Sequence, residues 1–279
     1  MGAGGFIGSA VAARLERDRI AVLRLDRNAV DLLSADGADR LSGQLRSGDV
    51  LVAAAAIAPC KTPIQLRDNM TLAFAIAQAA VQGSVSHLIN ISSDAVYADS
   101  IEPLNEASPR SPDSLHGVMH FAREALFSSA FSGPLTMLRP TLVYGAADPH
   151  NGYGPNRFRR LAAMGNPITL FGEGEERRDH VAIDDVAEIA AGVICRRSVG
   201  ALNVATGTVA SFREIAELVA ALSDHPVAIV GSPRSGPMPH NGYRAFDITA
   251  CRTALPDFSY TRLKEGLAKS CREATVVPA

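Results

Sequence analysis

The sequence predicts an α/β fold, a doubly wound parallel sheet with a smaller C-terminal α/β lobe. Strand-like apolar runs alternate with helix-length amphipathic segments, and a glycine-rich loop opens directly into the first of these helices. Because parallel strands need right-handed crossover connections, this alternation places helices on both faces of the sheet. The 279 residues suffice for one large domain with a smaller lobe beside it.

The expected elements follow from local patterns. Short apolar runs rich in β-branched residues predict strands at 20–25, 50–53, 87–91 and 135–138. Apolar residues spaced by three or four predict helices at 9–17, about 66–82 and about 117–129. After Pro140 the chain is rich in glycine and proline, and helices at 184–196 and 211–222 are expected to organise the smaller lobe. We therefore assign residues 1–145 to the larger domain and 146–279 mainly to the lobe, with some later segments returning to the larger domain.

Residues 2–8 read Gly-Ala-Gly-Gly-Phe-Ile-Gly and lead straight into a helix. Glycines here permit a tight turn and close approach of the backbone to a pyrophosphate, and the helix N-terminus offers free N–H groups. Asp26 ends the next expected strand, where a carboxylate can bond a ribose diol. These features predict a dinucleotide site, with a ligand-free glycine turn as the alternative. Asp26 favours NAD because it would repel a 2′-phosphate, while Arg27 keeps NADP open.

Such a loop normally follows a strand in the middle of the sheet, yet the sequence begins at Met1, one residue before the loop. An empty position there would leave buried N–H and C=O groups unpaired, at about 1–3 kcal/mol each. We therefore expect the first strand to be missing from this sequence and the native chain to begin upstream. The alternative is that the tail segment 275–277 (Thr-Val-Val) fills the position.

Composition excludes several classes of protein. The formal net charge is −2, so no polybasic face for nucleic acid is expected. No apolar run is long enough to span a bilayer, and there is no signal peptide. The four cysteines lack the spacing of a disulfide framework or a zinc site, which favours a reducing, cytoplasmic location.

Further motifs occur in a fixed order along the chain. They are the glycine loop, Asp31-Leu32, Ala55-Ala56, Asn69, residues 92–97 (Ser-Ser-Asp-Ala-Val-Tyr), residues 138–145 (Leu-Arg-Pro-Thr-Leu-Val-Tyr-Gly) and residues 172–179 (Gly-Glu-Gly-Glu-Glu-Arg-Arg-Asp). With them the chain resembles the NAD-dependent epimerase/dehydratase family of extended short-chain dehydrogenases/reductases, from the loop to about Leu267. The resemblance implies a Rossmann-type dinucleotide-binding domain, a substrate-binding lobe and a nucleotide-sugar substrate that passes through a transient keto form.

The resemblance also implies roles for individual residues. Asp31 and Leu32 would bracket the adenine, Ser93 would bond the reacting oxygen, and Pro140 would pass the nicotinamide. Asp94 stands beside that hydroxyl, and Asn156 and Arg178 match positions that often hold the sugar diphosphate; a surface ion pair is the alternative for Arg178. The candidate cofactor-binding residues are Gly2, Gly5, Phe6, Ile7, Gly8, Asp26, Arg27, Asp31, Leu32, Ala55, Ala56, Asn69, His120 and Pro140.

One departure from the family pattern concerns its acid–base pair. The family has a tyrosine that exchanges a proton with the substrate and, four residues later, a lysine that lowers the tyrosine pKa and holds the nicotinamide ribose. Residues 114–120 here read Ser-Leu-His-Gly-Val-Met-His, so these positions are His116 and His120, one helical turn apart. Gly117 and Glu124 keep the register.

His116 can exchange protons directly, because an unperturbed histidine has a pKa of about 6.5. A neutral His120 can still bond a ribose hydroxyl, and the positive nicotinamide of NAD⁺ favours neutral histidines. Several alternatives stay open: a metal site, for which no third ligand is identifiable; chemistry by Ser93, Asp94 or Tyr97; reduction or oxidation of another hydroxy or keto compound; and a non-catalytic NAD(P)-binding sensor or scaffold.

The two long helices also predict a homodimer. In many relatives they pair between subunits as a four-helix bundle, and Phe74, Ala75, Phe121 and Ala125 would allow close packing. The alternative is that these faces only cover the sheet.

Overall fold

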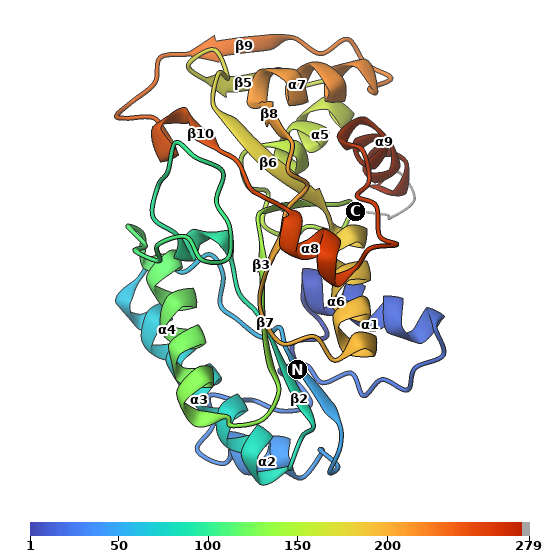
Figure 1. Cartoon of the computed structure of the whole chain (residues 1–279). Helices are drawn as coiled ribbons and strands as arrows, with labels where there is room; N and C mark the ends of the chain where they lie inside the picture. The colour runs from blue at the N-terminus through green and yellow to red at the C-terminus, as the bar shows by residue number, and fades with distance from the viewer. Residues whose placement is uncertain (275–279) are drawn as a thin grey trace.

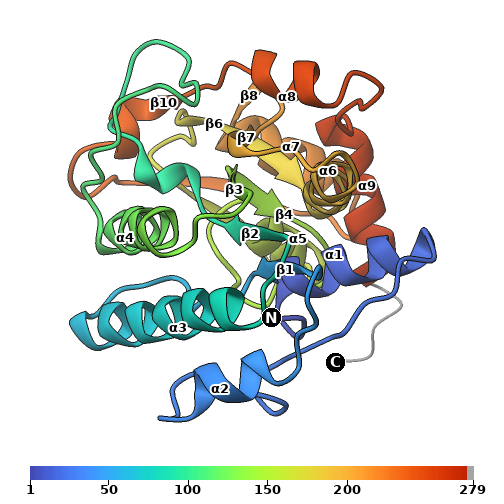
Figure 2. The same ribbon diagram turned by 60° about the horizontal axis from the view of Figure 1, so that its bottom comes forward.

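The computed structural model describes residues 1–274 (Figure 1). Its larger sheet is parallel and contains four strands in the order β1 (Val50–Ala53), β2 (His87–Ile91), β3 (Leu135–Pro140) and β7 (Gly200–Val204). Helices α2 (Gly37–Ser42), α3 (Pro63–Gln82) and α4 (Leu115–Ala130) cover one face, and α1 (Phe6–Arg17) and α6 (Ile183–Arg196) cover the other (Figure 2). The predicted α/β class is confirmed.

Both faces of this sheet are buried. Every residue of β2 is buried, with Leu88 in the core on the α3 side and Ile89 in the core on the α6 side. Strands covered on both faces read as continuous apolar runs, which is why periodicity located them correctly.

The smaller lobe lies beyond the carboxyl ends of these strands (Figure 1). It contains a mixed sheet of β4 (Leu142–Tyr144), β6 (Arg177–Ala182), β8 (Val209–Ser211) and β10 (Tyr243–Arg244), and a pair formed by β5 (Ile168–Phe171) and β9 (Ile229–Ser232). Helices α5 (Pro155–Ala163), α7 (Phe212–Ala221), α8 (Thr249–Ala254) and α9 (Leu263–Ala274) complete the C-terminal part. Two single turns, η1 (Asp94–Val96) and η2 (Pro239–Gly242), follow β2 and precede β10.

Residues 20–25 do not form the predicted strand. The Met1 amine donates to Val52 O (2.8 Å), Ala54 N donates to Met1 O (3.0 Å), and Gly2 N donates to Leu25 O (2.8 Å). Met1 and Gly2 thus lie between Leu25 and the end of β1, and within residues 1–274 no strand continues along this position. A β-strand forms only beside a neighbouring strand to which its backbone is hydrogen-bonded. Residues 20–25 have no such neighbour within residues 1–274 and therefore form no strand. The segment 275–277 lies outside the described residues.

The starts of α1, α3 and α4 were predicted two or three residues late. The third helix begins at Pro63, where Thr62 and Gln65 form a capping box, and the fourth begins at Leu115, capped by Ser114. Capping residues are polar, so apolar periodicity alone does not detect the first turn.

A buried polar cluster joins α4 to the sheet. Arg139 of β3 donates to both carboxylate oxygens of Glu124 on α4, from Nε (2.8 Å) and from an Nη atom (2.7 Å). Ser92 Oγ also donates to this carboxylate (2.7 Å), and Arg139 bonds the Tyr97 hydroxyl (2.7 Å). Burial alone would raise the pKa of Glu124, but the bonds from Arg139, Ser92 and Arg110 outweigh it and lower the pKa.

We predict that Glu124→Gln destabilises the fold by about 3 kcal/mol at pH 7, because it leaves Arg139 without its counter-charge. Folding lowers the pKa of the Glu124 carboxyl group below its ordinary value of 4.5. The carboxylate therefore stabilises the fold fully at pH values above 4.5, and this stabilisation is lost as the pH falls through the lowered pKa of the folded state. The difference in unfolding free energy between the parent and the variant should therefore shrink below pH 4.5. Urea unfolding of the parent and of Glu124→Gln at pH 7 and pH 4 measures their difference in unfolding free energy. An equal difference at both pH values would rule out the charge as the cause.

Candidate active site

The glycine loop leaves no room for side chains at two positions. A Cβ on Gly8 would lie 2.1 Å from Gly2 O, and one on Gly2 would lie 2.5 Å from Ala55 N. Gly2 also has a φ of +90°, which favours glycine. Helix α1 begins directly after Gly5 with no side-chain cap, so its first N–H groups remain available to an anion. These residues fit a pyrophosphate.

A groove of about 330 Å³ extends from this loop. Eight of the predicted cofactor-binding residues line it: Gly2, Gly5, Asp26, Arg27, Asp31, Leu32, Ala55 and Ala56. Sequence reasoning missed the apolar lining residues Val30, Leu33, Ile57 and Leu72, because no motif distinguishes them from core residues. Arg27 lies 3.6 Å from the Asp31 carboxylate, so its charge is already partly paired.

The other predicted cofactor residues do not line this groove. Asn69 is fully buried and bonds the backbone of Ile57 at both N–H (2.9 Å) and C=O (3.0 Å), so it holds the loop after β1 in place. Phe6 and Ile7 form the first turn of α1, behind the loop, and Pro140 is buried at the end of β3.

The two histidines face each other on the first turns of α4. Their ring centroids are 4.7 Å apart, with the planes nearly perpendicular at 88°. A Cβ on Gly117 would lie 2.2 Å from Ala95 O, so this glycine allows α4 to pack directly against η1. That close approach brings the histidines to the segment containing Ser93 and Asp94.

Burial keeps both imidazoles neutral. Burial lowers the pKa of His116, while the Asp94 carboxylate opposes this and His150 adds to it. The pKa of His120 lies well below its ordinary value because of burial, and then because of His116 and Arg123. Cys60 N donates to His116 Nδ1 at 3.4 Å, and His120 Nδ1 is buried without a hydrogen-bond partner within residues 1–274.

Two arginines of the smaller lobe converge on Asp94. Arg244 of β10 donates from Nε to the Asp94 carboxylate (3.1 Å), and a guanidinium nitrogen of Arg178 on β6 lies 3.9 Å from the same carboxylate. Ser93 Oγ donates to Asp94 as well (3.3 Å). Sequence reasoning missed Arg244, since its partner is 150 positions away and no motif contains it.

Two other candidates are engaged elsewhere. Asn156 accepts from Gly145 N (3.0 Å) and donates to Val143 O (3.3 Å), so both ends of its amide hold backbone. The Tyr97 hydroxyl is buried between Arg139 and Asn203, at 2.7 Å from each, away from the histidines. Tyr97 therefore has no free hydroxyl to offer a substrate.

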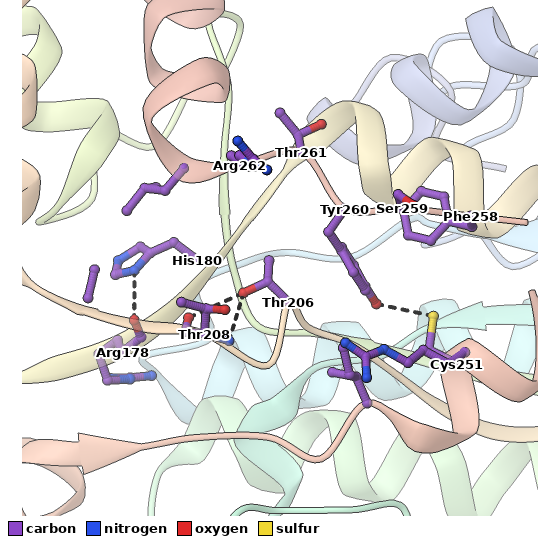
Figure 3. A pocket seen from close by; sticks show the side chains of 14 residues that line it. Arg178, His180, Thr206, Thr208, Cys251, Phe258, Ser259, Tyr260, Thr261 and Arg262 are labelled. Atoms are coloured by element: carbon purple, nitrogen blue, oxygen red, sulfur yellow. Dashed lines mark hydrogen bonds between the residues drawn. The ribbon is translucent and has the colours of Figure 1, made fainter. Parts of the chain in front are cut away.

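A second cavity, of about 380 Å³, lies between β6, β8, α8 and the segment 258–263 (Figure 3). Arg178 and His180 border it on one side, and Tyr260, which donates to Cys251 Sγ (3.1 Å), borders it on the other. Within residues 1–274 no three His, Cys, Asp or Glu side chains are grouped to hold a metal ion, and no helix is long and apolar enough to cross a membrane.

Known proteins resemble this chain over its whole length. UDP-glucose 4-epimerase of Mycolicibacterium smegmatis is 26% identical, over 96% of this chain and 95% of that protein. Two solved structures share the fold, each with a TM-score of 0.85 and 22% identity: UDP-glucuronic acid 4-epimerase from Bacillus cereus with UDP-glucuronic acid and NAD, and Thermus thermophilus UDP-glucose 4-epimerase with NAD. They cover 98% and 99% of this chain, and 97% and 98% of their own chains.

A family model matches most of this chain. Residues 1–205 match the model of the NAD dependent epimerase/dehydratase family. That span includes the whole larger sheet and all of α4. The chain therefore belongs to the NAD-dependent epimerase/dehydratase family.

Proposed function

We propose that this protein is an NAD-dependent enzyme that epimerises or dehydrates a nucleotide-linked sugar, with His116 as the acid–base group. One observation supports this above all: a single loop connects the two parts of the site. Residues 54–57 line the groove beside the glycine loop, and Cys60 of the same loop contacts His116. An extended dinucleotide bound along this loop would end beside the histidine pair.

The groove fits NAD better than NADP. Asp26 lines it, where its carboxylate would repel a 2′-phosphate, and the nearby Arg27 lies 3.6 Å from the Asp31 carboxylate. When bound, NAD would accept a hydride from the sugar carbon and return it. The protein residues bind and orient both molecules and move the hydroxyl proton.

The Cys60 contact selects a tautomer of His116. Because Nδ1 accepts from Cys60 N, the neutral ring has its proton on Nε2. In this form Nε2–H can donate a hydrogen bond to a sugar oxygen. Removal of a hydroxyl proton needs the other tautomer, in which Nε2 takes that proton and the long 3.4 Å contact is given up. The imidazolium so formed would return the same proton to the sugar oxygen when the keto form is reduced. Ser93 would bond the same oxygen, and His120 a ribose hydroxyl.

Arg178 would bind the diphosphate of the substrate. It is buried at the edge of the lobe, and in the part of the chain that the structure describes its Nε has no hydrogen-bond partner. A guanidinium fork suits bidentate phosphate binding. Its existing neighbours, Glu176 at 3.3 Å and Asp94 at 3.9 Å, hold it in position. Asn156 would act indirectly, by holding the backbone at 143–145.

We also propose a homodimer formed through α3 and α4, which pack side by side (Figure 2). Phe74 and Val81 of α3 are 63% and 54% exposed, and Val118 and Ala125 of α4 are exposed as well. The two other residues expected at this interface, Ala75 and Phe121, pack inward within the subunit. The outward apolar residues support a partner helix pair.

The first prediction from the proposed function is that the purified protein, once denatured, releases NAD⁺ or NADH in near-stoichiometric amount. A cofactor that is reduced and reoxidised within one turnover need not leave the enzyme. Chromatography and mass spectrometry of the released nucleotide test this. An empty protein that binds NAD(P)H reversibly would favour a net reductase or a sensor instead.

The second prediction concerns His116. Replacing it with Phe should lower kcat at least about 100-fold, the usual contribution of a general acid–base group, without loss of cofactor binding. In the parent, the acid limb of the kcat profile should fall below pH 6.5, because burial lowers the pKa of this base. The matched control is His225→Phe at an exposed position. Equal rates in the parent and in His116→Phe would remove His116 from the mechanism.

The third prediction is that Phe74→Glu converts the dimer to a monomer, because the new charge would be buried at the helix pair. Analytical ultracentrifugation measures the mass. Ile101→Glu, at an 85% exposed loop position, is the control and should leave the dimer intact. A Phe74→Glu variant that stays dimeric would place the interface elsewhere.

A further inference from the structure

Arg123 is a fully buried arginine next to the histidine pair. It lies on α4, three residues after His120, with none of its surface exposed. Its guanidinium donates to Ala55 O (3.0 Å) and Asn90 Oδ1 (3.2 Å), and its Nε has no hydrogen-bond partner among the described residues. It also lies over the ring of Phe127, 5.5 Å from the centroid.

No carboxylate within residues 1–274 forms an ion pair with this guanidinium. Burial lowers the pKa of Arg123 to about 10, so the group stays charged at neutral pH. Arg139, the neighbouring buried arginine, is instead fully paired with Glu124. Replacing a buried charge with an apolar side chain often leaves a fold equally stable, so packing alone gives no reason for a charge here.

The contacts and position of Arg123 connect it to the cofactor groove and to the histidine pair. The Ala55 carbonyl that it bonds belongs to the loop that lines the cofactor groove, and His120 lies one turn away on the same helix. The groups that face the histidines from other elements are Cys60 after β1, Asp94 of η1 and His150 of the loop before α5. Of the neighbours that act on His120, Arg123 is the one with a permanent charge.

We propose that Arg123 is a positioning residue of this site: its bond to Ala55 O holds the groove wall beside His120, and its fixed positive charge, one turn along α4, adds to burial in keeping that imidazole neutral. In the family, a lysine at the position of His120 supplies a positive charge. Here the positive charge of Arg123 lies one turn further along α4, behind the groove. A neutral His120 can bond a ribose hydroxyl and does not repel the positive nicotinamide. This inference rests on the proposed function, since it takes the histidine pair as the site.

The experiment compares Arg123→Gln, which removes the charge and keeps an N–H donor, with Arg123→Lys, which keeps the charge. NMR titration of histidine-labelled protein gives the pH midpoint of the His120 titration directly. The His120 signal is assigned from a His120→Gln variant. We expect Arg123→Gln to raise this midpoint by about one pH unit, the effect of losing a nearby like charge, and Arg123→Lys to leave it low. Arg159→Met, which replaces a buried arginine of α5, is the matched control and should not move it.

A second readout is the affinity for NAD⁺, measured by titration between about pH 5 and pH 8. It should be nearly independent of pH in the parent and in Arg123→Lys, and should weaken toward acid pH in Arg123→Gln. If Arg123→Gln does not fold, Arg123→Met takes its place, because an apolar replacement for a buried charge is usually tolerated. An unchanged His120 midpoint in the neutral variant would overturn the inference. A raised midpoint in a protein that turns over no nucleotide sugar would support the inference and count against the proposed function.

Discussion

The site depends on the packing of α4 against the end of the sheet. At Gly117 the helix touches the carbonyl of Ala95 so closely that a single methyl group would separate them. Two turns later, Glu124 is bonded by Arg139 of β3 and by Ser92, at the start of the same segment. These two contacts hold the helix against the end of β2, with the histidines beside the segment that contains Ser93 and Asp94.

This rigid placement gives the site its electrostatic character. Burial keeps both imidazoles neutral, and the nearby carboxylate of Asp94 is held by Arg244 and lies near Arg178. Both imidazoles are therefore neutral, while permanent charges lie around them in fixed positions. In the proposed function such an arrangement would suit proton exchange next to a cationic nicotinamide, because the imidazoles add no positive charge there.

Local sequence patterns predicted most of the larger domain and the phosphate-binding end of the groove. The buried strands β1, β2 and β3 were located because continuous apolar runs have few other interpretations, and the loop at 2–8 was recognised from its glycines. Residues 20–25 look like a strand by the same criterion but have no ladder, because strand formation also requires a neighbour. The roles of Asn69 and Asn156 in holding backbone were not foreseen, since an amide has the same appearance in a sequence whether it binds a ligand or a loop.

The sequence by itself determined the fold class, the family, the glycine loop and the presence of two histidines one turn apart, because these depend on residue type and spacing along the chain. The tertiary structure alone decided which charges surround those histidines. Arg244 reaches Asp94 across 150 positions, and Arg123 finds the Ala55 carbonyl 68 positions away. The electrostatics of a buried site depend on distances through space, and these exist only once the chain has folded.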